Sequence, residues 1–122
     1  MAKRILVVDD EKDLVSVLLQ RLKAHGYETA SANDGEEALR TIKKEKFDLI
    51  ILDIMMPIMD GTELGQILKN DPKTKHIPII FLTALQTKQP DAGYDIVGPN
   101  VVFAKPFDIK ELTAKIDELL TK

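Results

Sequence analysis

Residues 5–10 read Ile-Leu-Val-Val-Asp-Asp, a run of apolar residues that leads directly into two carboxylates. The pattern recurs along the chain: residues 49–53 read Leu-Ile-Ile-Leu-Asp, residues 79–83 read Ile-Ile-Phe-Leu-Thr, and residues 101–105 read Val-Val-Phe-Ala-Lys. Apolar runs without alternation are typical of strands whose two faces are both buried, as in parallel sheets. These runs therefore predict the central strands of a parallel sheet, each ended by a polar residue.

Segments with helical periodicity lie between and after these runs. Apolar spacing predicts a helix over about residues 11–25, which a glycine ends, and two further helices around residues 38–42 and 64–68. Asp108 suits the N-cap of a last helix. Residues 27–32 form a weaker, more polar candidate strand, which suits the edge of a sheet. The alternation of strands and helices predicts a doubly wound α/β fold with a parallel sheet.

The segment from Gln86 to Asn100 does not fit this alternation. It reads QTKQPDAGYDIVGPN and holds two prolines and two glycines. Inside a helix, Pro costs about 3 kcal/mol and Gly about 1 kcal/mol relative to Ala. We therefore expect the helix between the fourth and fifth strands to be short, broken or mobile.

Length, charge and composition exclude several classes of protein. The 122 residues correspond to one domain, residues 1–122, on a prior of about 150 residues per domain. A net charge of −3 argues against a domain that coats nucleic-acid backbones, and the absence of Cys excludes disulfides and thiolate chemistry. The apolar runs are too short for a secretory signal or a membrane span. We expect a soluble, cytoplasmic protein with no membrane partner and no direct contact with nucleic acid.

The polar residues at the strand ends form the candidate site: Asp9, Asp10, Asp53, Thr83 and Lys105. In open parallel sheets, ligands bind outside the carboxyl ends of the strands, so folding should gather these side chains at one edge. Repelling carboxylates make a site for a hard divalent cation such as Mg²⁺. A hydroxyl and an ammonium can hold and neutralise phosphoryl oxygens. The chemistry predicted is phosphoryl transfer to a carboxylate.

Each of these residues also has a purely structural interpretation. Residues 9–11 could cap the first helix and complement its dipole, and Asp53 could open a turn before Pro57. Thr83 and Lys105, taken singly, could be a strand-end hydroxyl and a surface lysine. Taken together, however, the structural interpretation needs four coincidences at one edge of the sheet, which favours a site.

Four motifs in order make the chain resemble the receiver domain of two-component response regulators, including the chemotaxis regulators. They are the acidic residues 9–11, residues 53–57 (Asp-Ile-Met-Met-Pro) continuing to residues 60–61 (Asp-Gly), residues 83–84 (Thr-Ala), and residues 105–107 (Lys-Pro-Phe). The resemblance covers essentially the whole chain. It implies a flavodoxin-like, five-stranded parallel sheet with strand order 2-1-3-4-5 and helices on both faces.

The resemblance also implies roles for the site residues. Asp53 would be the phosphoacceptor, and Asp10, Asp53 and the backbone carbonyl of Met55 would ligate Mg²⁺ directly. Asp9 would act through a metal-bound water.

The phosphate itself would be held by two further residues. Thr83 would bond a phosphoryl oxygen, and Lys105 would pair with Asp53 and then with the phosphate. The partners implied are a sensor histidine kinase or a histidine phosphotransfer protein, and a downstream target that the sequence does not name. The protein would be no enzyme beyond its own phosphorylation and slow dephosphorylation, and a monomer or a weak, phosphorylation-dependent dimer.

Other functions remain open or are disfavoured. The chain could be an interaction module that works without phosphorylation, or the amino-terminal receiver of a longer DNA-binding or enzymatic regulator. A phosphotransferase of the haloacid dehalogenase type is disfavoured because no Asp-x-Asp follows the first strand. A dinucleotide-binding domain is disfavoured because no Gly-x-Gly-x-x-Gly follows it either.

Overall fold

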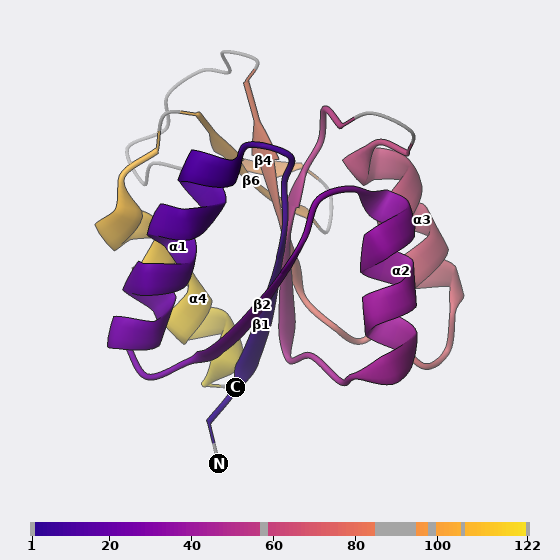
Figure 1. Ribbon diagram of the computed structural model, residues 1–122, viewed down its shortest axis with the longest axis horizontal. Coiled ribbons are helices and arrows are strands. Elements are labelled where there is room, and N and C mark those ends of the chain that lie inside the picture. The colour runs from indigo at the N-terminus through magenta and orange to yellow at the C-terminus, as the bar shows by residue number, and fades with distance from the viewer. Residues whose placement is uncertain (1, 57–58, 85–94, 98–99, 106, 122) are drawn as a thin grey trace.

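The computed structural model describes residues 2–56, 59–84, 95–97, 100–105 and 107–121 (Figure 1). Five strands of the described sheet are parallel: β1 (Arg4–Val8), β2 (Glu28–Ala32), β3 (Leu49–Asp53), β4 (Ile79–Thr83) and β6 (Asn100–Ala104). They lie in the order β2-β1-β3-β4-β6, which confirms the predicted order of the five parallel strands. The more polar strand β2 lies at the edge, as predicted.

A sixth strand, β5 (Asp95–Val97), was not predicted. It pairs antiparallel with β6 and lies at the other edge of the sheet. The strand lies within residues 86–100, the segment expected to hold only a short, broken or mobile helix, and residues 85–94 and 98–99 lie outside the described residues. The sequence offers a physical reason: Ile96 and Val97 are β-branched, and β6 would otherwise leave an edge of unpaired backbone groups.

Helices cover both faces of the sheet, as predicted. They are α1 (Lys12–Ala24), α2 (Gly35–Lys44), α3 (Gly61–Asn70) and α4 (Ile109–Leu120). Figure 1 shows α1 and α4 on one face and α2 and α3 on the other. None of the described helices is long and apolar enough to cross a membrane.

The helix ends follow local sequence signals. Aspartate side chains cap three helices by accepting a backbone N–H: Asp34 for α2, Asp60 for α3 and Asp108 for α4. The cap at Asp108 was predicted. Gly26, just after α1, adopts a positive φ of 97° that other residues rarely tolerate, so its position explains where α1 ends. By contrast, Glu11 at the N-cap of α1 makes no capping hydrogen bond with its side chain.

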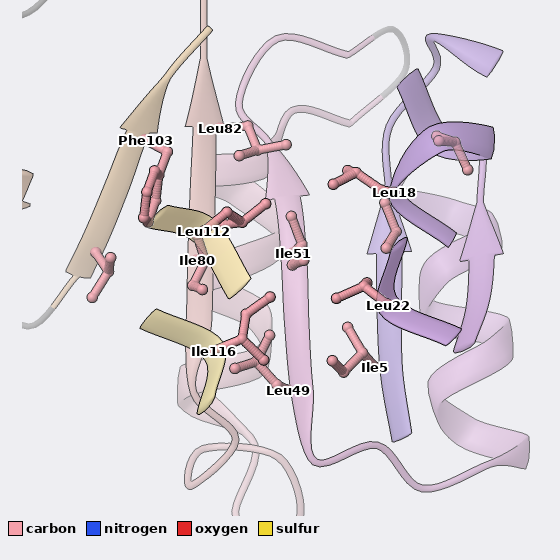
Figure 2. Close-up of a cluster of buried hydrophobic side chains, with 13 residues drawn as sticks. Ile5, Leu18, Leu22, Leu49, Ile51, Ile80, Leu82, Phe103, Leu112 and Ile116 are labelled. Atoms are coloured by element: carbon pink, nitrogen blue, oxygen red, sulfur yellow. The ribbon is translucent and has the colours of Figure 1, made fainter. Parts of the chain in front are cut away.

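The hydrophobic core has two halves, one on each face of the sheet. Alternate residues of a strand point to opposite faces, so Ile5 packs on the α1/α4 side and Leu6 on the α2/α3 side. Figure 2 shows the first half, where Leu18 of α1 and Ile116 of α4 meet the central strands. Burial of each such side chain contributes about 1.5–3 kcal/mol. Burial on both faces explains the uninterrupted apolar runs, and it makes the sheet a fixed support for the residues at its edge.

Candidate functional site

The strand ends bring the predicted site residues to one edge of the sheet. Asp9 directly follows β1, Asp53 and Thr83 are the last residues of β3 and β4, and Lys105 directly follows β6. The parallel register aligns these ends, with Asp53 beside Leu82 of β4. Backbone bonds continue the alignment past the strands, since the Lys105 N–H donates to the Thr83 carbonyl at 2.7 Å.

Three carboxylates form the centre of the site. Asp9, Asp10 and Asp53 each offer one oxygen, and these oxygens all lie within 4.8 Å of one another. Asp9 is 1% exposed and Asp53 is 4% exposed, whereas Asp10 is open to solvent. Buried like charges at this separation repel one another strongly. Such a set of oxygen donors, two of them buried, fits a hard divalent cation such as Mg²⁺.

Lys105 lies over this acidic cluster. Its Nζ lies 3.0 Å from Asp9 Oδ2, 3.4 Å from Asp53 Oδ2 and 2.6 Å from Glu11 Oε1. The contact with Asp53 is one that the family resemblance implied for this lysine. The shortest contact, to Glu11, was not predicted, because the sequence pattern gave Glu11 only a place in the acidic run and a capping role.

The protonation of Asp53 reflects its surroundings. Burial, followed by the negative charge of Asp9, raises the pKa of Asp53 from 3.8 to about 6. The charge of Lys105 and a backbone N–H from Met55, which donates to Asp53 Oδ1 at 3.3 Å, lower this pKa in part. Burial and the charge of Asp9 together outweigh Lys105 and the Met55 N–H, so the ionised form of Asp53 is disfavoured in the folded protein.

The pKa of Lys105 moves in the opposite sense to what burial alone would produce. Burial lowers it, but hydrogen bonds to Glu11 and Asp9 and the charges of Asp9 and Asp53 raise the pKa of Lys105 above its ordinary value. The lysine is consequently a permanent cation at physiological pH, which suits it to pair with an anionic group.

Two further predicted residues lie beside Asp53. Met55 is 61% exposed and its backbone N–H contacts the Asp53 carboxylate, so the main chain at Met55 is close to the acidic cluster. Thr83 is 3% exposed at the end of the neighbouring strand. The sequence motif included Gly61 but gave it no role, and a Cβ there would lie 2.3 Å from the carbonyl oxygen of Asp53. Only a glycine lets α3 begin so close to the end of β3.

Comparison with known proteins establishes the family. Residues 5–117 match the family model described as the response regulator receiver domain. The chain belongs to this family. A receiver domain is a signalling module of two-component systems rather than a catalytic enzyme, and the acidic triad of this receiver is typical of a Mg²⁺ site.

Relatives of known identity match the whole receiver. The alkaline phosphatase synthesis transcriptional regulatory protein PhoP of Bacillus subtilis is 39% identical over 127 residues, which cover 100% of this chain and 50% of PhoP. The response regulator PleD of Caulobacter vibrioides is 40% identical over 98% of this chain and 26% of its own length. The receiver thus spans half, or less, of the length of these two relatives.

Solved structures agree with the fold and with the acidic site. The response regulator protein TrrA of Thermotoga maritima, solved in complex with Mg²⁺-BeF, has a TM-score of 0.79 and 36% identity, with 97% of this chain and 99% of that chain covered. The receiver domain of a sensor histidine kinase from Pseudomonas aeruginosa has a TM-score of 0.82 and 26% identity, with both chains fully covered. That structure holds a magnesium ion coordinated in the active site cleft.

Proposed function

We propose that residues 1–122 form one receiver domain that takes a phosphoryl group onto Asp53, in the presence of Mg²⁺, from a histidine kinase or a histidine phosphotransfer protein. The observation that carries this proposal is the position of Asp53. Its carboxylate is at the carboxyl end of β3, shares a 4.8 Å cluster with Asp9 and Asp10, and lies 3.4 Å from the ammonium of Lys105. A nucleophilic carboxylate beside a cation is what phosphoryl transfer requires.

The acidic cluster and the receiver family support a proposal for the metal ligands. We assign direct ligation to Asp10, Asp53 and the backbone carbonyl of Met55, and a water-mediated contact to Asp9. The ion would supply positive charge that neutralises the phosphoryl oxygens, in addition to the charge of the lysine. The support is the set of close carboxylate oxygens, together with the Mg²⁺ in the two similar receiver structures.

In the transfer step, an ionised Asp53 oxygen attacks the phosphorus of a phosphohistidine. A P–O bond forms while the P–N bond breaks, and the histidine nitrogen leaves with the bonding electron pair. A pKa of about 6 leaves Asp53 mostly ionised at neutral pH, as the attack requires. We assign the Thr83 hydroxyl and the Lys105 ammonium to the phosphoryl oxygens of the product, because both side chains are at the same sheet edge.

The output of the receiver is a change in partner binding. Phosphorylation adds negative charge and acceptor oxygens, so Thr83 and Lys105 would exchange their present contacts for contacts with the phosphate. A DNA-binding output in a longer protein is the second candidate, because PhoP is a transcriptional regulatory protein of which this chain covers 50%. The receiver itself has a net charge of −3, which disfavours direct DNA binding.

Phosphorylation with acetyl phosphate and Mg²⁺ tests the proposal. Intact-protein mass spectrometry should show one added phosphoryl group, which peptide mapping places on Asp53. Asp53→Asn should remove the modification, and Asp10→Ala should lose the metal dependence and most of the rate. Asp13→Asn, which changes an exposed acid of α1, serves as the matched control and should react like the unmodified sequence. Full labelling of the Asp53→Asn protein at another residue would overturn the assignment.

A further inference from the structure

Lys105 is shared among three carboxylates: it donates hydrogen bonds to two of them and forms an ion pair with the third. An ammonium has three donors, and here its neighbours are Glu11 at 2.6 Å, Asp9 at 3.0 Å and Asp53 at 3.4 Å. The two hydrogen bonds hold the ammonium closer to Glu11 and Asp9 than to Asp53. A phosphoryl oxygen on Asp53 therefore competes with Glu11 and Asp9 for the donors of Lys105.

The three carboxylates differ in how readily they can be released. The side chain of Asp9 is 0% exposed and that of Asp53 is 5% exposed, whereas that of Glu11 is 59% exposed. A buried carboxylate that loses its cation is left without compensation, which is costly. An exposed carboxylate that loses its cation is hydrated by water instead, and such pairs contribute little to stability. Glu11 is thus the partner that leaves Lys105 most easily.

Within the part of the chain that the structure describes, the Glu11 side chain contacts Lys105 and does not cap its own helix. It is the N-cap residue of α1, but its side chain caps no backbone N–H. Its backbone N–H donates to Asp9 Oδ1 at 2.9 Å, which fixes the main chain while the side chain reaches Lys105 from 94 residues away in sequence. The carboxylate of Glu11 therefore acts on the lysine and not on the helix.

We propose that Glu11 is a positioning residue: it holds Lys105 toward the turn between β1 and α1 in the unphosphorylated receiver and competes with the phosphoryl group for that lysine. This inference rests on the proposed function of Asp53. Glu11 then disfavours the phosphorylated state, because the Glu11–Lys105 ion pair draws the ammonium away from a phosphoryl group on Asp53. Loss of the Glu11 charge should therefore favour the state in which Lys105 contacts the phosphate.

Affinity for a phosphoryl mimic tests the competition. Binding of beryllofluoride at saturating Mg²⁺ is followed by two-dimensional amide NMR for the unmodified receiver, Glu11→Gln and Asp13→Asn. We expect Glu11→Gln to bind about three- to fivefold more tightly, the range that release of a partly exposed ion pair allows. Asp13→Asn removes an equal charge from the first turn of α1 and should change the affinity less than twofold if the lysine contact, not the general field, is what matters.

A double-mutant cycle measures the coupling between Glu11 and Lys105 through protein stability, without a phosphoryl mimic. Urea unfolding in metal-free buffer compares Glu11→Gln in the Lys105 background and in a Lys105→Met background. The positioning role predicts that Glu11→Gln lowers the unfolding midpoint only where Lys105 is present, whereas a purely structural Glu11 would have the same effect in both.

The outcomes separate the two proposals. If the unmodified receiver binds no beryllofluoride, the proposed function fails and the competition fails with it. If the unmodified receiver binds the mimic but Glu11→Gln binds it no more tightly than Asp13→Asn does, only the role of Glu11 is overturned. Equal effects of Glu11→Gln in both arms of the cycle would overturn that role as well.

Discussion

Replacement of Asp53 by Asn should stabilise the receiver at neutral pH when divalent cations are absent. The Asp53 side chain is 5% exposed and faces the charge of Asp9, and these two effects raise its pKa from 3.8 to about 6. The ionised carboxylate is therefore unfavourable in the folded protein. Asparagine has nearly the same shape and can still accept the N–H of Met55, but it carries no charge.

The sign and size of the effect follow from linkage. A raised pKa means that the folded receiver holds the Asp53 proton more tightly than the unfolded chain does. The stability contributed by this proton is fully present below about pH 4 and is lost as the pH rises through about 6. The difference between the two pKa values corresponds to about 3 kcal/mol, at about 1.4 kcal/mol per pKa unit. Because the surroundings of Lys105 relax, we expect Asp53→Asn to raise the free energy of unfolding at neutral pH by about 1–2 kcal/mol.

Urea unfolding followed by circular dichroism, with a chelator present, measures this gain. The unfolding midpoint of Asp53→Asn should exceed that of the unmodified receiver near pH 7, and the difference should shrink toward about pH 4.5. Asp13→Asn, at an exposed position, should show no such pH dependence. An Asn variant that is less stable near pH 7, or a difference that grows on acidification, would refute the argument from buried charge.

Three further substitutions probe the same edge of the sheet. Lys105→Met should lower the free energy of unfolding by about 1–3 kcal/mol in metal-free buffer, because the buried carboxylates lose their cation. Addition of Mg²⁺ should restore much of the lost stability, and a variant whose stability does not respond to Mg²⁺ would contradict this explanation. Gly61→Ala should lower the melting temperature more than Gly26→Ala does, because a Cβ at Gly61 meets the Asp53 carbonyl at 2.3 Å. A Cβ at Gly26 meets open space, so Gly26→Ala should cost only the strain of its positive φ, about 1 kcal/mol. Met55→Asn should shorten the lifetime of the phosphoryl group on Asp53, measured as release of inorganic phosphate, because an amide beside the site can orient water and a thioether cannot.

The parallel strands could be predicted because each is encoded by its own apolar run, and the run recurs along the chain. Each run such as residues 5–8 is apolar at every position, which fits a strand buried by helices on both faces. Strand β5 could not be predicted in the same way. It has three residues, Asp95–Val97, and its pairing depends on the free edge of β6, a property of the folded sheet and not of the segment itself.

The residues of the candidate site also differ in how far the sequence could predict their positions. Side chains that end a strand, such as Asp53 and Thr83, are placed by the sheet, so their meeting could be predicted once the strands were recognised. The contact of Glu11 with Lys105 depends on where two flexible side chains extend beyond the strand ends, and no periodicity encodes that. Gly61 is similar, because its need for a missing Cβ arises only when α3 packs against the end of β3.

The buried carboxylates make the site the part of the fold where stability and signalling are coupled. The core on both faces of the sheet fixes Asp9 and Asp53 in positions that their charges alone would not favour. A proton, Lys105 or a divalent cation can each neutralise this pair, and any ligand that binds the folded state stabilises it in proportion to its affinity. Proton and cation therefore compete for the same oxygens, and the receiver should hold a cation more weakly below about pH 6, where Asp53 takes up its proton. Under the proposed function, phosphorylation of Asp53 would change this balance of charge at the sheet edge, where Lys105 is shared among three carboxylates.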